Sequence, residues 1–143
     1  LQELTQSLVG IIRTEKELKD ALKKIDSLRA RATKAKAEGG RAFNPGFHLT
    51  LDLDNMLLVS ECIALSALTR QESRGGHTRD DYPGMNSKWR QVNHATQWNG
   101  KKIALKSLKA KPLPKELHSL FEMDELKKYF TETELKSMKG GKK

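Results

Sequence analysis

The highest density of chemically capable side chains lies in Glu72–Pro83, which reads Glu-Ser-Arg-Gly-Gly-His-Thr-Arg-Asp-Asp-Tyr-Pro. The stretch holds two arginines, one histidine, three carboxylates, a serine, a tyrosine and two glycines. Groups of these types can bind a metal, act as a nucleophile with its base, hold a phosphate, or pair with one another. The stretch is therefore the candidate functional site, and we refer to it as the motif loop.

Metal binding and nucleophilic catalysis both have weak support in the motif loop. A zinc site needs about four ligands of the His, Cys or carboxylate type, but the four histidines are scattered and no HExxH or CxxC occurs. Ser73 lies four residues before His77, yet no surrounding motif indicates a nucleophile beside its base.

The single cysteine, Cys62, excludes an internal disulfide and fits a reducing compartment. We interpret it as a small buried hydrophobe.

Two other interpretations use the arginines of the motif loop. A phosphate-cradling loop would draw on its basic and small residues, which are Arg74, Gly75, Gly76 and Arg79. No GxxxxGK[ST] sequence is present to support that chemistry. In a structural interpretation the two arginines pair instead with the neighbouring carboxylates, which are Glu72, Asp80 and Asp81. His77 would then be a hydrogen-bonded residue at an interface.

Helical patterns precede the motif loop. Residues 1–11 have apolar side chains at helical spacing and read as the last turns of a helix that begins upstream, so we expect the chain to be a piece of a longer protein. Thr14–Glu17 has the sequence of a capping box, which predicts a helix over about 15–37. A second long helix is predicted over about 49–71. Because it is apolar on most of its sides, we expect more than one neighbour to cover it.

A hairpin and short helices are predicted after the motif loop. Asn99-Gly100 separates the runs 89–98 and 101–108, and this dipeptide is a strong hairpin signal because both turn positions need positive φ. Residues 117–138 read as short helices, with a second capping box at 131–134. The last four residues are expected to be a frayed tail.

These elements predict a mainly α fold: a three-helix bundle of the spectrin-repeat kind with a truncated first helix, an appended β-hairpin and short C-terminal helices. Residues 1–86 are expected to form the bundle that ends in the motif loop. Residues 87–143 would supply the hairpin and the short helices of the same domain. A length of 143 residues fits one domain.

The net charge of +9 is unevenly distributed. No Asp or Glu occurs from Tyr82 through Lys115, although this segment contains many lysines. A basic face of this kind can bind nucleic acid, anionic lipid or an acidic protein, and a solvated surface is the plain alternative.

The chain has no apolar run of about 18 residues, so we expect no transmembrane span.

The motif loop resembles a motif in the C-terminal helical domain of succinate dehydrogenase and fumarate reductase flavoprotein subunits. That pattern reads approximately Glu-Ser-Arg-Gly-Ala-His-x-Arg-Glu-Asp-Tyr-Pro, and Gly76 and Asp80 are mild departures from it. Val9–Leu18 and Asn55–Glu61 are also similar to family segments, and the bacterial forms of actinobacteria are the most similar. The residues of the close match are Ser73, Arg74, Gly75, His77, Arg79, Asp81 and Pro83.

The resemblance implies a parent oxidoreductase that interconverts succinate and fumarate by hydride transfer with FAD. In the family, FAD and the dicarboxylate are held by an FAD-binding domain and a capping domain, so no catalytic, cofactor-binding or metal-binding residue is expected in this chain. The matching residues are predicted to lock the helical domain against those two domains. The resemblance also implies an iron–sulfur subunit, a membrane anchor and a location at the inner, cytoplasmic face of the plasma membrane. The basic hairpin would dock the iron–sulfur subunit or lie near the membrane.

Two alternatives remain for the function. L-aspartate oxidase has a similar Glu-Ser-Arg-Gly-x-His loop, but the His-x-Arg-x-Asp continuation here favours the dehydrogenase side. A basic helical module that binds nucleic acid is the alternative from another class. Acidic residues interleave with the basic ones on the helix over 15–37, and this argues against nucleic acid as a partner. Self-association of the chain is a further expectation, through the surface that would otherwise meet the catalytic domains.

Overall fold

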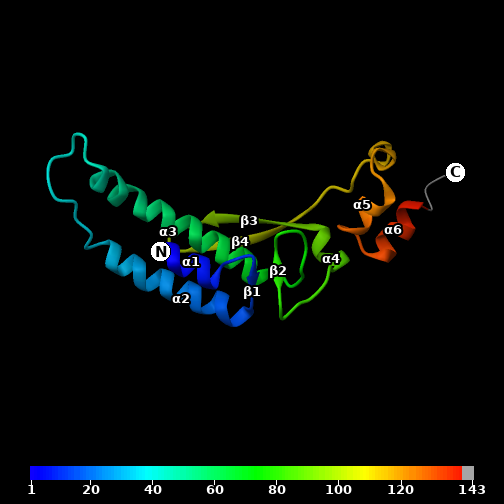
Figure 1. Ribbon diagram of the computed structural model, residues 1–143, viewed down its shortest axis with the longest axis horizontal. Coiled ribbons are helices and arrows are strands. Elements are labelled where there is room, and N and C mark those ends of the chain that lie inside the picture. The colour runs from blue at the N-terminus through cyan, green and yellow to red at the C-terminus, as the bar shows by residue number, and fades with distance from the viewer. Residues whose placement is uncertain (140–143) are drawn as a thin grey trace. The chain divides into compact units, whose positions relative to one another are not determined.

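The computed structural model describes residues 1–139, apart from the side chains of residues 115, 118, 119 and 139 (Figure 1). The predicted frayed tail lies outside these described residues. The chain divides into two compact units, Leu1–Thr69 and Arg70–Lys143, and the motif loop belongs to the second. The sequence-based division at residue 86 stays a prediction.

The first unit is a helical hairpin with a short helix beside it (Figure 1). Its elements are α1 (Gln2–Leu8), the short extended segment β1 (Ile12–Arg13), α2 (Glu15–Ala32) and α3 (Pro45–Thr69). The predicted capping box starts α2: the Glu17 amide donates to the Thr14 hydroxyl, and the Thr14 amide donates to the Glu17 carboxylate at 2.7 Å. This reciprocal pairing satisfies amides that have no partner inside the helix.

The core of the first unit lies between α2 and α3. Ile25, Leu57 and Ala64 are fully buried, and partly buried apolar side chains from all three helices pack around them. Glu61 of α3 also pairs with Arg29 of α2 at the edge of this core. Packing of one face of each helix therefore holds the hairpin together.

The ends of the long helices differ from the sequence-based prediction. α2 ends at Ala32, before the predicted residue 37. Beyond it the backbone bonds span three residues and not four: the amide of Lys34 donates to the Arg31 carbonyl at 3.0 Å. α3 starts at Pro45, four residues before the predicted 49. Asn44 caps it through a bond from the Phe47 amide at 3.1 Å. Asn followed by Pro is a helix-start signal, because Asn caps and Pro fits the first helical position.

The second unit contains short elements. They are β2 (Thr78–Arg79), α4 (Ser87–Arg90), β3 (Val92–Trp98), β4 (Ile103–Lys109), the 3-10 helix η1 (Lys115–Leu120), α5 (Met123–Lys127) and α6 (Glu132–Lys139). The capping box predicted at Thr131 is formed, since the Thr131 amide donates to the Glu134 carboxylate at 2.8 Å.

The predicted hairpin is present, but its turn is shifted by one residue. β3 and β4 pair antiparallel from Val92–Lys109 to Trp98–Ile103, so Trp98 and the buried Ile103 share one face. The Asn99 amide donates to the Lys102 carbonyl at 3.2 Å, which leaves residues 100–101 at the centre of the turn. Gly100 takes a φ of 92°, whereas Asn99 keeps a negative φ. Only one central residue thus needs the left-handed region, as in a type II′ turn.

The predicted fold class is confirmed: the described residues form a mainly α structure with an appended hairpin and short C-terminal helices. Within these residues, no helix has the length and the apolar character needed to cross a bilayer.

Two neighbouring leucines of α3 test where the core lies. Leu57 is fully buried and Leu58 is 39% exposed. Leu57→Ala is expected to lower the free energy of unfolding of this chain by about 2–5 kcal/mol, because it leaves a cavity. Leu58→Ala, the matched control, should cost less than about 1 kcal/mol. Urea unfolding followed by circular dichroism measures both, and equal costs would contradict this assignment of the core.

Candidate functional site

The motif loop is closed by backbone hydrogen bonds. The Ser73 amide donates to the Gly84 carbonyl at 2.8 Å and joins the two ends of the loop. Arg74 and His77 exchange amide-to-carbonyl bonds of 2.8 and 3.1 Å around the two central glycines. Gly75 has a φ of 58°, a conformation that a side chain resists. The paired glycines therefore serve a tight turn.

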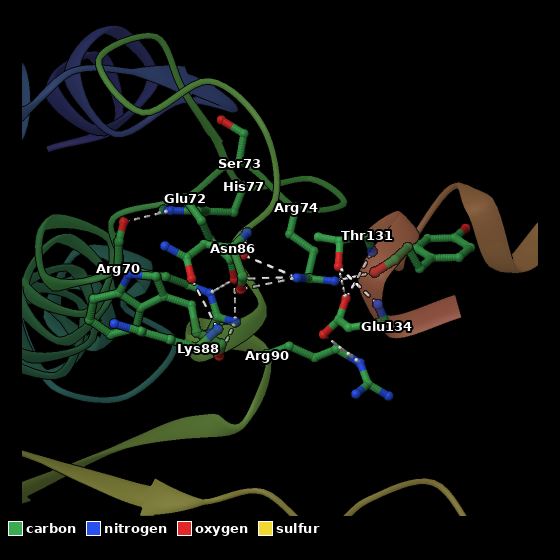
Figure 2. Close-up of polar contacts among 12 residues, drawn as sticks. Arg70, Glu72, Ser73, Arg74, His77, Asn86, Lys88, Arg90, Thr131 and Glu134 are labelled. Atoms are coloured by element: carbon green, nitrogen blue, oxygen red, sulfur yellow. Dashed lines mark hydrogen bonds and ion pairs between the residues drawn. The ribbon is translucent and has the colours of Figure 1, made fainter. Parts of the chain in front are cut away.

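Ser73 and His77 are both directed at backbone carbonyls. The Ser73 hydroxyl lies 3.1 Å from the Arg79 carbonyl and 3.0 Å from the Tyr82 carbonyl, and it accepts a bond of 2.8 Å from the Arg79 amide. Nε2 of His77 lies 3.1 Å from the Arg70 carbonyl (Figure 2). These contacts support a structural role for the serine hydroxyl rather than its activation by the histidine.

Glu72 is the centre of the charged contacts. Its side chain is 0% exposed. One carboxylate oxygen accepts bonds from Nε and Nη2 of Arg70 at 2.8 and 2.6 Å. The other accepts from Nε of Arg74 at 3.2 Å and from the Asn86 amide at 2.8 Å (Figure 2). Two cations and one backbone donor thus compensate a buried negative charge.

These partners change the acidity of Glu72. Burial by itself raises the pKa of the carboxyl, but the bonds from the Asn86 amide and from the Arg74 and Arg70 guanidinium groups outweigh that effect. The pKa therefore lies below its ordinary value of 4.5, because the hydrogen bonds favour the charged form. Glu72 is ionised at neutral pH.

A second ion pair, between a buried arginine and an exposed aspartate, lies at the other end of the loop. The Arg79 side chain is 0% exposed, and its Nε and Nη2 donate to the two carboxylate oxygens of Asp81 at 2.8 and 2.7 Å. The same guanidinium lies 4.9 Å from the centre of the Tyr82 ring. The predicted pairing thus forms for Glu72 and Asp81, whereas Asp80 is exposed. Pro83 is also exposed and directly precedes Gly84, whose carbonyl closes the loop.

Several members of this cluster were not predicted from the sequence. The signal for Arg70 is the alternation Arg70-x-Glu72-x-Arg74, which places three charged side chains on one side of an extended segment. Nη1 of Arg74 donates to the carbonyl of Tyr129, and Nη2 donates to the Asn86 carbonyl at 3.3 Å. A bond to a carbonyl more than fifty positions away has no signal in the sequence.

Taken together, the described residues of the motif loop form an internally paired polar cluster. No group of three or more His, Cys, Asp or Glu side chains suited to a metal ion occurs among them or elsewhere in the described part of the chain. The loop geometry is that of a rigid connector in a helical domain.

Comparison with known proteins assigns that domain to a family. The family described as "Fumarate reductase flavoprotein C-term" matches residues 1–128. The chain therefore belongs to the C-terminal domains of the succinate dehydrogenase and fumarate reductase flavoproteins, and the predicted resemblance is confirmed.

Individual relatives agree with this assignment. The succinate dehydrogenase flavoprotein subunit of Coxiella burnetii is 34% identical over 105 residues, which are 72% of this chain and 18% of that protein. In the solved structure of the Mycobacterium smegmatis Sdh1 complex, a chain that is 45% identical matches 94% of this chain with a TM-score of 0.77. Only 23% of that chain is covered. This protein thus spans about one fifth of the length of these relatives.

Glu72→Gln is expected to lower the free energy of unfolding by about 3–5 kcal/mol at pH 7, because two partly buried guanidinium groups lose their counter-charge. Since the folded pKa is depressed, this contribution is complete above about pH 4.5 and disappears as the pH falls below it. The difference between the parent chain and the variant should therefore shrink at acid pH.

Urea titrations at neutral and acid pH measure this difference. Asp80→Asn is the matched control, because it removes an exposed carboxylate of the same loop and should change stability by less than about 0.5 kcal/mol. A difference between parent and Glu72→Gln that stays constant down to pH 3 would contradict the assigned role of the Glu72 charge.

Proposed function

We propose that this chain packs against the FAD-binding and capping domains of its own flavoprotein, an enzyme that interconverts succinate and fumarate. Family membership supports the parent activity. FAD would be bound by those other domains, and the chain described here would supply no catalytic residue. Its role would be structural: it would pack against the catalytic domains and stabilise them.

The observation that carries this proposal is the surface of α3. Leu51 and Leu58 are 58% and 39% exposed, and with Leu65 they recur every seven residues. We call these three residues the outer stripe of α3. Residues seven apart lie on nearly the same side of a helix. Leu57, which packs in the core, is one position away and therefore points in another direction.

A second exposed stripe lies on the other side of the core-facing residues. Leu49, Met56 and Ile63 also recur every seven residues, and they are 62%, 41% and 51% exposed. An open groove of about 510 Å³ beside α1 includes Met56 and Val59 in its lining. Contiguous apolar surfaces of this kind mark interaction sites. The predicted need for further neighbours around this helix is therefore attributed to the remaining domains of the subunit.

The motif loop contributes to this proposal through its rigidity. Several of its charged groups bind partners inside the loop, so they hold the shape of the surface that the loop presents. The interface role of the seven matching residues remains part of the proposal. In this arrangement the apolar stripes of α3 and the preformed polar loop would each contact the catalytic domains.

The pair Leu51→Asp and Leu58→Asp, introduced together into the full-length flavoprotein, tests this proposal. An aspartate buried without a partner is strongly disfavoured, so FAD content and turnover are expected to fall about tenfold or more. The double variant of the isolated chain should keep its helical signal, since both positions are exposed there.

Lys23→Asp and Lys24→Asp, on the exposed face of α2, form the matched control and should leave FAD content unchanged. Normal FAD content and turnover in the double variant of α3 would overturn the proposed packing of that helix. Loss of helical signal in the isolated chain would instead indicate that the core had been disturbed.

A second proposal concerns partners of the whole complex. The hairpin would dock the iron–sulfur subunit, and through that subunit and a membrane anchor the protein would sit at the inner face of the plasma membrane. Its support is the basic character of the hairpin: Lys101 and Lys102 are exposed, and no acidic residue occurs from 82 through 115. A positive surface favours an acidic protein partner.

Lys101→Glu with Lys102→Glu is expected to weaken assembly with the iron–sulfur subunit about tenfold at low salt, because two favourable charges become repulsive. Co-purification of the subunits at low and high salt measures the effect. Lys16→Glu with Lys19→Glu, at exposed positions of α2, is the control. Unchanged assembly of the hairpin variant would rule out this docking surface.

A further inference from the structure

The C-terminal helices α5 and α6 follow a segment that has few backbone amides able to donate hydrogen bonds. The ladder of the hairpin continues to the Ala110 amide, which donates to the Gln91 carbonyl at 2.7 Å. Residues 111–114 have no regular secondary structure and contain Pro112 and Pro114, which lack an amide proton. The placement of α5 and α6 within the second unit therefore depends on contacts made further along the chain.

Arg74 makes the first of these contacts. Its guanidinium is anchored to Glu72 through Nε (Figure 2). Its Nη1 donates to the carbonyl of Tyr129. Tyr129 lies in the turn that follows α5 and its C-cap Lys128, so its carbonyl is not a helix carbonyl. The guanidinium of Arg74 supplies the donor for this carbonyl. Arg74 thus links the motif loop to the turn after α5.

Arg90 makes the second contact. Its Nε lies 3.7 Å from a carboxylate oxygen of Glu134, and its guanidinium lies 4.0 Å from the centre of the Phe130 ring. The other carboxylate oxygen of Glu134 accepts the Thr131 amide at the start of α6. Glu134 thus combines two tasks, since it caps α6 and attracts Arg90 (Figure 2). Arg90 links the end of α4 to the segment between α5 and α6.

We propose that Arg74 and Arg90 form a releasable clasp that holds α5 and α6 as a strap against the motif loop. The strap buries few large side chains, notably Leu126 and Leu135. The guanidinium groups of Arg74 and Arg90 link it to the loop and to α4. Regions with few buried apolar contacts open at a lower free-energy cost than the core does. The strap therefore opens while the α2–α3 hairpin stays folded, and opening breaks the bond from Nη1 of Arg74 to the Tyr129 carbonyl.

Hydrogen exchange of the full-length flavoprotein, read by mass spectrometry, tests the clasp. Arg90→Ala is expected to speed amide exchange in residues 123–139 about five- to tenfold, because one charge-assisted contact is lost. Glu134→Gln should give a similar but smaller increase, since glutamine still completes a capping box but cannot attract Arg90 as an anion. Exchange in α2 and α3 should not change.

A double-variant cycle separates the clasp from unrelated damage. Arg90→Ala combined with Glu134→Gln should increase exchange by less than the product of the single effects, because both remove the same contact. Arg31→Ala, at an exposed position of α2, is the control and should leave residues 123–139 unchanged. Unchanged exchange in the strap of the Arg90 variant, or an equal increase in α2 and α3, would overturn the proposal.

Discussion

The buried charge of Glu72 is the constraint on which the organisation of the second unit depends. An isolated carboxylate that loses its water is strongly disfavoured, so it must have charged or hydrogen-bonded partners. Here the partners come from both sides of the motif loop: Arg70 and Arg74 flank the carboxylate, and the Asn86 amide approaches from beyond the loop. Meeting this one requirement brings the start of the loop next to the segment that leads into α4.

The same requirement extends outward through the arginines, because each has more donors than one carboxylate can accept. Arg70 also donates to the Trp89 carbonyl at 2.8 Å, and Arg74 donates to the Tyr129 carbonyl. A buried anion is therefore surrounded by cations that in turn bind one carbonyl within the short helix α4 and one in the turn after α5. Such short helices are marginal in isolation, and contacts at their ends take over part of the stabilisation that long helices obtain from a buried face.

Local interactions explain which features could be predicted. The capping boxes at Thr14 and Thr131 and the hairpin depend on residues a few positions apart, and all three are present. The start of α3 was predicted too late because Asn44-Pro45 suits both a turn and a helix start. The turn after β3 was displaced by one residue, since Asn99 keeps a negative φ and uses its side-chain oxygen to accept the Lys101 and Lys102 amides.

The candidate site shows where sequence reasoning reaches its limit. The residue types in the motif loop are those of an active site, and only the contacts distinguish a catalytic from a structural interpretation. The Ser73 hydroxyl bonds to backbone carbonyls, and Arg74 and Arg79 pair with the carboxylates of Glu72 and Asp81. A motif can thus be diagnostic of an enzyme family because the fold needs its charges to pair in one way. The apolar stripes of α3 carry the complementary signal, since Leu51 and Leu58 remain 58% and 39% exposed within the described residues. The polar residues of the motif loop have hydrogen-bond partners within the chain, whereas the apolar stripes of α3 remain exposed. Each of these two features favours the role of a supporting domain.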